Sequence, residues 1–290
     1  MTDHPIAEPR RRAMSRSRPT VLYVSDLAYP AKGRRYCDED IHLTSQLRHH
    51  FDLAITHPEN AADLMAAFDT VVVRNSGPVL GHQAAHEAFK ERAKAANQRV
   101  YNPLTGKGDM AGKQYLVDLT AEGFPVIPTT GAADLDRLPE APEYAVKPKA
   151  GADSHGLEFV KAEDLESTLA GKAGEDLLVQ PKIDFRYEVS FYFVDHDFQY
   201  ALHAPDPAKR WELTHYAPSG EDLEFARQFV RWNDLDHGVQ RVDACRTRDG
   251  GLLLVELEDL NPYLSLDRTT DEVRKNFVDA MTNSIRSSLT

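Results

Sequence analysis

The chain has 290 residues, 41% of them hydrophobic and 28% charged, which is the balance of an ordinary globular protein long enough for two domains. Its formal net charge of −12 argues against a nucleic-acid surface, because affinity for phosphate backbones needs clustered Lys and Arg. No apolar run approaches the roughly 18 residues that could cross a bilayer. We therefore expect neither a nucleic acid nor a membrane as a partner.

The two cysteines, Cys37 and Cys245, lie far apart in the sequence. A disulfide framework is not expected, and a reducing cytoplasm is the predicted location. Residues 1–18 are basic and have no apolar segment behind them, so we expect a disordered tail rather than a secretory signal.

Strand and helix patterns alternate from residue 19 to residue 105. Short apolar runs predict buried strands, and apolar residues recurring every three or four positions predict helices between them. This alternation predicts a small parallel sheet with helices on its faces, and ligands of such sheets bind beyond the carboxyl ends of the strands. The predicted strands are 20–26, 52–56, 69–76 and 99–103, and the predicted helices are 38–51, 62–68 and 82–98.

A different pattern follows, in which strands gather into antiparallel hairpins with helices packed on them. Such a pattern is typical of an α+β architecture. The predicted helices are 110–122, 162–171, 221–232 and a terminal helix after Asp267. The predicted strands are 143–148, 157–160, 176–181, 186–194, 198–204, 211–217 and the two strands of a hairpin within 241–266.

This last hairpin carries three carboxylates where a core strand would carry Val or Ile. If residues 249–250, Asp-Gly, form a two-residue type I′ turn, Asp243 lies opposite Glu256, and Arg241 lies opposite Glu258. The three carboxylates then share one face, because alternate residues of a strand point the same way. The other face is expected to be apolar and covered, with Val242, Ala244, Val255 and Leu257.

Three convergent carboxylates in a covered sheet are costly unless a cation neutralises them. All-oxygen ligands suit Mg²⁺ or Mn²⁺, and Mg²⁺ is often shared with substrate phosphates, which points to a nucleotide. The alternative is a solvated edge hairpin in which Arg241 pairs with one glutamate. The twelve histidines show no metal-ligand spacing.

Two lysines upstream are candidates for binding phosphates. Lys147 ends a predicted strand before the loop 149–156, and the Gly and small polar residues of this loop would let backbone N–H groups approach a phosphate. Lys113 is expected on the first turns of the helix 110–122. Each feature is also common on ordinary protein surfaces.

A candidate site for a flat heterocycle lies in the Gln-Pro-Lys-Ile run 180–183. Pro181 offers a carbonyl but no N–H, so a heterocycle could be read by this carbonyl and by the amide of Ile183.

Taken in order, the motifs YNPLTGKGDMAGK, YAVKP, LLVQPKI, YEVS and RVDACRTRDGGLLLVELEDLNP resemble the ATP-grasp superfamily of carboxylate-amine ligases. The resemblance spans about 100–266, and a small α/β lobe precedes it, as in those enzymes. It implies an ATP-grasp fold with an α/β N-terminal lobe over 19–105 and two α+β ATP-grasp lobes. These are a central subdomain over 106–183 and a C-terminal subdomain with a metal site over 184–290.

The resemblance also implies which residues bind ATP and magnesium. The phosphates of ATP would be bound by Lys113, Lys147, Gly151 and Ser154. The adenine would be bound by Gln180, Pro181 and Ile183, and the ribose by Glu188. The residues implied for Mg²⁺ are Asp243, Glu256 and Glu258. At Glu258 the sequence departs from the family, in which many members have Asn. The additional negative charge of this glutamate would alter how a second ion is held.

The family's chemistry transfers the γ-phosphoryl group of ATP to a carboxylate, and an amine then attacks the resulting acyl phosphate. Such a step depends on charge neutralisation by metals and basic side chains. We expect Arg210 and Arg241 to supply it, with pairing to Glu258 as the alternative role of Arg241. The residues expected to line the substrate site are Arg74, His203, His215 and Asn261, with ordinary core or surface positions as the alternative for the two histidines.

Three functions remain open at this point. The first is a ligase that joins a small-molecule acid, such as an amino acid, to an amine. The acid and the amine can belong to one molecule, and the reaction then closes a ring. The second is an enzyme that ligates side chains of a peptide or protein, for which no inserted recognition element is evident. The third is a nucleotide-binding regulator without catalysis. Family members are commonly dimers, so a homodimer is also an expectation.

Overall fold

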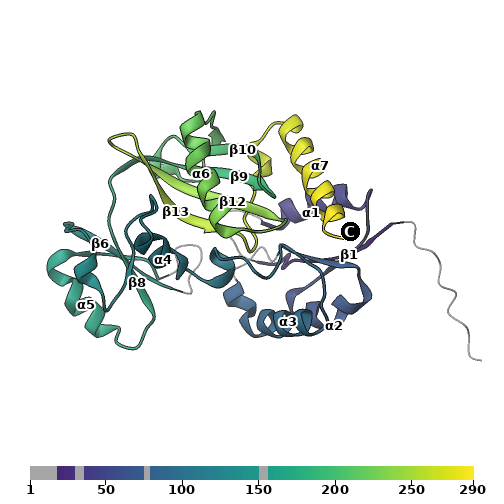
Figure 1. Ribbon diagram of the computed structural model, residues 1–290, viewed down its shortest axis with the longest axis horizontal. Coiled ribbons are helices and arrows are strands. Elements are labelled where there is room, and N and C mark those ends of the chain that lie inside the picture. The colour runs from purple at the N-terminus through teal and green to yellow at the C-terminus, as the bar shows by residue number, and fades with distance from the viewer. Residues whose placement is uncertain (1–17, 30–35, 75–78, 150–155) are drawn as a thin grey trace, which may run out of the picture.

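The structure is a computed structural model, and it describes residues 18–29, 36–74, 79–149 and 156–290. Its strands form three sheets (Figure 1), the first at the lower right of the view, the second at the left and the third above. Apart from Arg18, the predicted basic tail lies outside the described residues. Among the described helices, none is long and apolar enough to cross a membrane.

The first sheet is parallel, as predicted, with the strand order β2-β1-β3-β4. Both faces of its central strands are apolar and are covered by helices: Val21 and Tyr23 face one core, and Leu22 and Val24 face another. The elements are β1 (Thr20–Val24), α1 (Tyr36–Leu47), β2 (Asp52–Thr56), α2 (Ala61–Leu64), β3 (Thr70–Val73), α3 (Gln83–Ala95) and β4 (Val100–Tyr101).

The second sheet is antiparallel, with the order β5-β8-β6-β7. Helix α5 packs on it through Leu165, which lies in one core with Val146 and Val179. The elements are α4 (Tyr115–Ala121), β5 (Thr130–Gly131), β6 (Glu143–Pro148), β7 (Glu158–Lys161), α5 (Leu165–Gly171) and β8 (Leu177–Pro181).

The helix predicted over 110–122 begins later than expected, at Tyr115. Gly112 has a φ of 84°, a left-handed conformation that an α-helix does not continue through. A short 3₁₀ helix, Asp109–Ala111, precedes this glycine. Lys113 therefore lies in the turn before the helix and not on its first turns.

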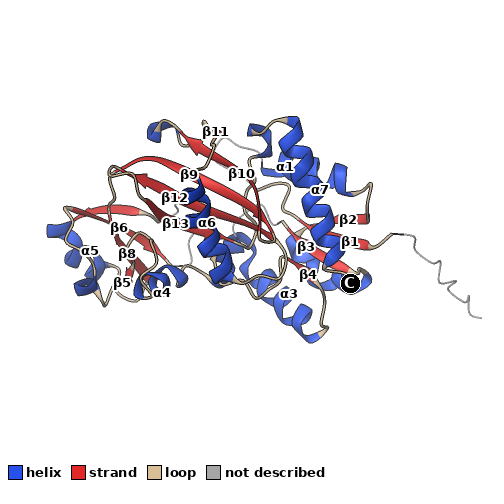
Figure 2. Cartoon of the chain, turned by 45° about the horizontal axis from the view of Figure 1, so that its top comes forward, coloured by secondary structure: helices blue, strands red, loops and turns tan. Residues whose placement is uncertain are grey.

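The third sheet has the order β11-β10-β9-β12-β13 and is antiparallel. Figure 2 shows helix α6 lying along it. Most of its strands match the predicted ranges, but the strand expected over 211–217 is reduced to Thr214–His215. The elements are β9 (Phe185–Val194), β10 (Asp197–Ala204), β11 (Thr214–His215), α6 (Gly220–Asn233), β12 (Val239–Thr247), β13 (Leu252–Glu258) and α7 (Asp271–Ser287).

The turn between β12 and β13 is longer than the two residues expected. Thr247 and Gly251 are the closing pair, because the Thr247 N–H donates to the Gly251 carbonyl at 3.0 Å. The loop between them has three residues, and its last, Gly250, has a φ of 100°, which favours glycine. The prediction of a type I′ turn over 249–250 was therefore wrong.

The predicted pairing of the carboxylates is nevertheless confirmed. A β-bulge after Asp243 shifts the register by one residue, so that Asp243 pairs with Glu256 and Arg241 with Glu258. The bulge also changes the apolar face, since the buried residue there is Leu254 and not Val255. The longer turn and the bulge offset each other in register.

The first and third sheets share one hydrophobic core. Tyr23 of β1 is buried in the same cluster as Tyr192 of β9, Tyr200 of β10 and Phe277 of α7. Burying each such side chain stabilises the fold by about 1.5–3 kcal/mol. The face of the third sheet that carries Tyr192 and Tyr200 is called here the inner face. The division into subdomains at 105/106 and 183/184 stays a prediction.

Candidate active site

Three carboxylates meet on the inner face of the third sheet. Asp243 lies on β12, on the same face as Val239 of the core shared with Tyr192, and Glu256 and Glu258 lie on β13. One ligand oxygen from each lies within 4.8 Å of the others, and all three side chains are half-buried. We call these three residues the carboxylate cluster.

Arg241 neutralises part of this cluster. Its Nη2 donates to Oδ2 of Asp243 at 2.7 Å and also to Glu258, and its Nε donates to Oδ1 of Asp243 at 2.9 Å. Its Nη1 donates to the carbonyl of Tyr263 at 2.7 Å. These contacts fit the salt-bridge alternative for Arg241, and they also place its guanidinium beside the cluster.

Lys113 approaches the cluster from the second sheet's side. Its Nζ lies 2.6 Å from Oε1 of Glu256, and its backbone N–H donates to the carbonyl of Lys149, just beyond β6. Lys147, at the end of β6, lies near enough to Lys113 and Glu256 for their charges to affect it. The two predicted phosphate-binding lysines are thus brought together with the carboxylate cluster.

The charges of the cluster perturb one another. Burial raises the pKa of Glu258 to about 8, and the negative charges of Asp243 and Glu256 act in the same direction. The positive charge of Arg241 opposes this shift. Burial acts upward on Glu256 as well, but the charges of Lys113, Lys147 and Arg241 and the hydrogen bond from Lys113 together outweigh it, and the pKa of Glu256 is lowered. Burial, together with the charge of Lys113, lowers the pKa of Lys147 to about 8. With fewer cations than carboxylates in contact, the cluster favours further positive charge.

Glu188 of β9 and Arg210 form an ion pair at the same face. Nε of Arg210 donates to Oε2 of Glu188 at 3.0 Å. Burial raises the pKa of Glu188, opposed by Arg210 and supported by the negative charge of Asp243. Arg210 follows a 3₁₀ helix, Pro207–Lys209, rather than starting a strand, and its side chain is half-exposed, so it is accessible to a ligand.

The predicted adenine segment connects the second sheet to the third. Gln180 and Pro181 end β8, and β9 begins at Phe185. Gln180 is buried, and its Nε2 donates to Oγ1 of Thr129 at 2.7 Å. Ile183 lies between the two strands and is half-buried. Gly151 and Ser154, predicted to contact phosphates, lie outside the described residues.

The residues predicted for the substrate lie in different environments. Arg74, beyond β3, is buried: Nη1 donates to the carbonyl of Pro262 at 2.7 Å, and Nη2 donates to Glu39 at 3.0 Å. Asn261 is next to Pro262 and half-buried. These contacts bring the carboxyl edge of the first sheet against the segment that follows the carboxylate cluster.

The two histidines predicted at this site are not brought to the carboxylates. His203 pairs with Val189 and therefore points to the opposite face of the third sheet, where its ring lies between Tyr187 and Tyr216. His215 is exposed on the edge strand β11. Strand alternation from β10 could have indicated this placement for His203.

A brace between 102–110 and the end of β13 was missed by the sequence reasoning. Asp259 is fully buried and accepts hydrogen bonds from the N–H groups of Gly108 and Met110, each at 2.9 Å. In return, Asp109 accepts one from the N–H of Asp259 at 2.7 Å. The glycines of YNPLTGKG leave room for this contact, since a Cβ on Gly106 would lie 2.2 Å from Oδ2 of Asp259.

The donor set of the carboxylate cluster fits a hard divalent cation. Its ligand atoms are all oxygen and converge within 4.8 Å, as Mg²⁺ and Mn²⁺ prefer. The cations that contact it in this structure, Arg241 and Lys113, show that the cluster needs positive charge.

Comparison with known proteins gives both sequence and fold relatives. No family model matches the chain. It is 27% identical over 238 residues to the cycloserine biosynthesis protein DcsG of Streptomyces lavendulae, a match that covers 70% of this chain and 79% of the relative.

Three solved structures resemble the chain over nearly its whole length. The crystal structure of D-cycloserine synthetase DcsG superposes with a TM-score of 0.73 at 22% identity, covering 93% of this chain and 100% of that one. The ATP-grasp ligase PsnB complexed with a minimal precursor gives 0.64 at 16% identity, covering 92% and 99%. D-alanine–D-alanine ligase from Bacillus anthracis gives 0.65 at 12% identity, covering 94% and 98%. The chain therefore has the ATP-grasp fold, as its motifs predicted.

Proposed function

We propose that this protein is an ATP-dependent carboxylate-amine ligase acting on a small molecule. The observation that carries the proposal is the convergence of Lys113, Lys147 and Arg241 on the carboxylate cluster. The sequence relative and the fold relatives named above support it, since they are described as a cycloserine biosynthesis protein, a synthetase and ligases.

In the first step, an oxygen of the substrate carboxylate attacks the γ-phosphorus of ATP, and the bond to the β-phosphate oxygen breaks. An acyl phosphate and ADP result. Lys113 and Lys147 would hold the transferring and leaving phosphates, and Lys113 would exchange Glu256 for a phosphate oxygen. Gln180, Pro181 and Ile183 would hold the adenine, and Glu188 the ribose. Positioned charge of this kind supplies most of the catalysis of phosphoryl transfer.

In the second step, an amine attacks the acyl carbon, phosphate leaves, and the amine nitrogen loses a proton. Arg210, half-exposed and held by Glu188 at 3.0 Å, would bind the phosphate oxygens of the acyl phosphate. Arg241 would do so from the side of the cluster. Asp243, Glu256 and Glu258 would hold Mg²⁺ or Mn²⁺, which supplies positive charge to the phosphates when bound.

A small-molecule substrate is favoured over a peptide. The relative with the higher identity and TM-score is the cycloserine enzyme, whereas the PsnB structures complexed with precursor are at 14–16% identity. The name of the former's product also favours the ring-closing form of the reaction, in which acid and amine belong to one molecule. Ligation on a peptide is the second candidate, and a non-catalytic nucleotide-binding regulator is a weaker third.

ADP release tests the proposal directly. We expect ADP from ATP, Mg²⁺ and a panel of amino acids bearing a second amine or hydroxylamine-type nitrogen. In Glu256→Gln this release should be lost, while Glu224→Gln, on the exposed face of α6 and paired to Arg231, should match the wild type. ADP release at wild-type rate in Glu256→Gln would refute the assigned site.

Mass spectrometry of the product separates the two forms of the reaction. Ring closure needs one organic substrate and gives a product lighter than it by one water. Joining two molecules requires both in the assay. ADP formed only when a precursor peptide is present would favour the second candidate instead.

We also propose a cytoplasmic homodimer. Cys37 and Cys245 are buried and form no disulfide, which suits a reducing compartment. Light scattering after size-exclusion chromatography measures the number of chains directly.

A further inference from the structure

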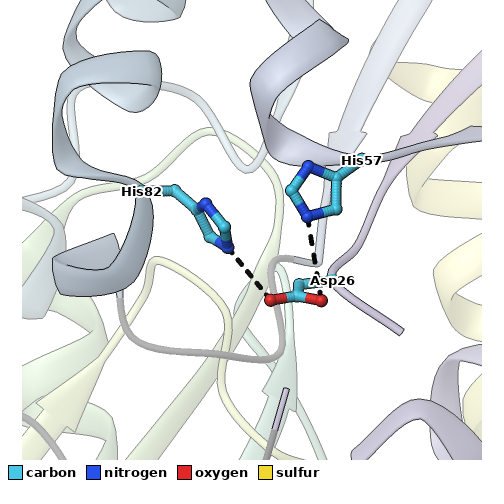
Figure 3. A group of neighbouring side chains, drawn as sticks. All are labelled: Asp26, His57 and His82. Atoms are coloured by element: carbon cyan, nitrogen blue, oxygen red, sulfur yellow. Dashed lines mark hydrogen bonds and ion pairs between the residues drawn. The ribbon is translucent and has the colours of Figure 1, made fainter. Parts of the chain in front are cut away.

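A second group of metal-binding side chains lies on the first sheet, away from the carboxylate cluster. It consists of Asp26, His57 and His82 (Figure 3), and one ligand atom from each lies within 4.8 Å of the others. We call these residues the histidine cluster. Nothing in the proposed ligase reaction uses it.

Three separate elements place these residues at one edge of the sheet. Asp26 follows β1 and His57 directly follows β2, and the two strands pair in parallel, Val24 beside Thr56. His82 ends the short 3₁₀ helix Val79–His82 that leads into α3. Asp26 and His57 thus lie beyond the carboxyl ends of parallel strands, where α/β sheets bind ligands, and His82 reaches them from the start of α3.

The distances fit a shared ion. Nε2 of His82 lies 3.0 Å from Oδ2 of Asp26, a hydrogen bond that a shared ion would replace. Nε2 of His57 lies 3.8 Å from Oδ1 of Asp26, which is too long for a hydrogen bond. Two ligands on one tetrahedral zinc ion, each about 2.0–2.2 Å from it, lie roughly 3.3–3.6 Å apart. Both observed separations are within about half an ångström of that range.

Neighbouring groups hold the ligands as those of a metal site are held. Nδ1 of His82 lies 3.1 Å from Oε1 of Glu59, so a carboxylate braces the ring nitrogen that does not face the cluster. Metal-ligating histidines commonly have this arrangement, which fixes the ring and raises its basicity. Oδ1 of Asp26 also accepts a hydrogen bond from the N–H of Ala28 at 2.9 Å, which fixes the carboxylate.

We propose that Asp26, His57 and His82 bind one divalent transition-metal ion of the zinc class, with Glu59 as the outer partner of His82. Two imidazoles and one carboxylate are a donor set of zinc and of related borderline ions, whereas Mg²⁺ favours oxygen donors. Three protein ligands leave a further coordination position for water or for an oxygen or nitrogen donor of a small molecule.

Metal binding through Nε2 of His57 breaks one weak hydrogen bond to this ring. The N–H of Glu59 points at Nδ1 of His57 at 3.3 Å, and a ring that ligates through Nε2 keeps its proton on Nδ1. That long contact is therefore given up, and the backbone amide of Glu59 turns to another acceptor or to water. The ring of His57 is free to adjust, since 42% of its side-chain surface is exposed.

Titration of the full-length protein with ZnCl₂ tests the proposal, in excess Mg²⁺ so that the carboxylate cluster is not the zinc ligand. Isothermal calorimetry should give one ion per chain. We expect Glu59→Gln to weaken the affinity roughly 10- to 100-fold. His57→Ala and His82→Ala each remove a ligand, and Asp26→Asn removes the negative charge of one; all three should weaken the affinity further. His215→Ala removes an exposed histidine elsewhere and should leave the affinity unchanged.

Co²⁺ provides a second readout that does not depend on heat signals. Bound by two imidazoles and a carboxylate, Co²⁺ should give visible absorption bands that are lost in His57→Ala. The side chain of His57 is exposed, so its removal should leave the fold intact. Wild-type protein that binds no zinc in excess Mg²⁺ would overturn the proposal. Equal zinc affinity in His57→Ala and wild type would assign the ion to other residues and would overturn it as well.

Discussion

The carboxylate cluster and the histidine cluster differ in their donor atoms and in how the chain assembles them. The first offers oxygen alone from the two strands of one hairpin, whereas the second offers two nitrogens and one oxygen from three elements. Hard cations prefer the first set and borderline transition ions the second. A chain that has both clusters can bind hard cations at the first and transition-metal ions at the second.

The charges around the two clusters also differ. Arg241 and Lys113 contact the carboxylate cluster, whereas the outer group at the histidine cluster is the acid Glu59. If ATP binds as we propose, its phosphates can take over the cations at the first cluster. At the second, Glu59 orients a ligand and offers nothing that would bind an anion. The first is suited to a nucleotide and the second to an ion.

The largest effect is expected from Glu256→Gln. It removes a carboxylate that contacts Lys113 and that we propose to bind the metal. The kcat for ADP release should then fall at least about 10³-fold, because a metal supplies several kcal/mol of charge stabilisation to the transition state. Zinc binding in excess Mg²⁺ should be unchanged in this variant. Loss of both would show that the two clusters are not independent.

The next effect concerns stability. Arg241→Met leaves Asp243 and Glu258 without their partner, which should lower the free energy of unfolding by about 3 kcal/mol, the lower end for breaking a buried ion pair, since water reaches this site. Mg²⁺ should restore part of the loss by taking the place of the guanidinium. Urea unfolding with and without Mg²⁺ measures this.

Arg246→Met is the matched control for that rescue. Arg246 contacts Asp222 at 2.6 Å on the other face of the sheet, away from the cluster. Its loss should destabilise the protein equally with and without Mg²⁺. Rescue of both variants by Mg²⁺, or of neither, would contradict the assignment of the ion to the carboxylate cluster.

Sequence reasoning found one cluster and missed the other for a physical reason. Strand pairing within a hairpin is local, so alternation and an assumed turn were enough to place Asp243 opposite Glu256, even though the turn itself was wrong and a bulge offset it. Asp26, His57 and His82 are 25 or more positions apart, and only the parallel pairing of β1 with β2 and the position of α3 bring them together. The order of the strands in a parallel sheet cannot be predicted from the spacing of residues within one segment.

The same limit explains other differences between expectation and structure. The motif order predicted the fold, because buried strands and glycine-rich turns leave local signals. The brace through Asp259 and the burial of Arg74 against Glu39 depend on contacts between residues more than 30 positions apart. Side-chain contacts of this kind follow from packing and could not be inferred from single segments.

A smaller effect is expected where the backbone brace supports the carboxylate cluster. In Gly106→Ala the new Cβ would lie 2.2 Å from Oδ2 of Asp259, a buried group held by two backbone N–H groups. Overpacking of this kind should cost about 2 kcal/mol of stability, measured by urea unfolding. Gly171→Ala is the control, because its Cβ meets nothing within 4 Å, and a similar loss there would remove the argument for the brace.

The smallest effect is a pH dependence of ATP binding, which arises from Lys147 beside the carboxylate cluster. Burial, together with the charge of Lys113, lowers the pKa of Lys147 to about 8, so the ammonium is mostly charged at pH 7 and mostly neutral at pH 9. If Lys147 binds ATP phosphates, the Kd for ATP should rise about tenfold over this range, because the charged fraction of Lys147 falls about tenfold between one pH unit below its pKa and one unit above it. Calorimetry with a non-hydrolysable ATP analogue at three pH values measures this. Lys147→Arg keeps its charge throughout and should lack this rise, leaving only the titration of Glu258, whose pKa is also about 8. An equal rise in this variant would assign the titration to another group and would show that the phosphates do not depend on Lys147.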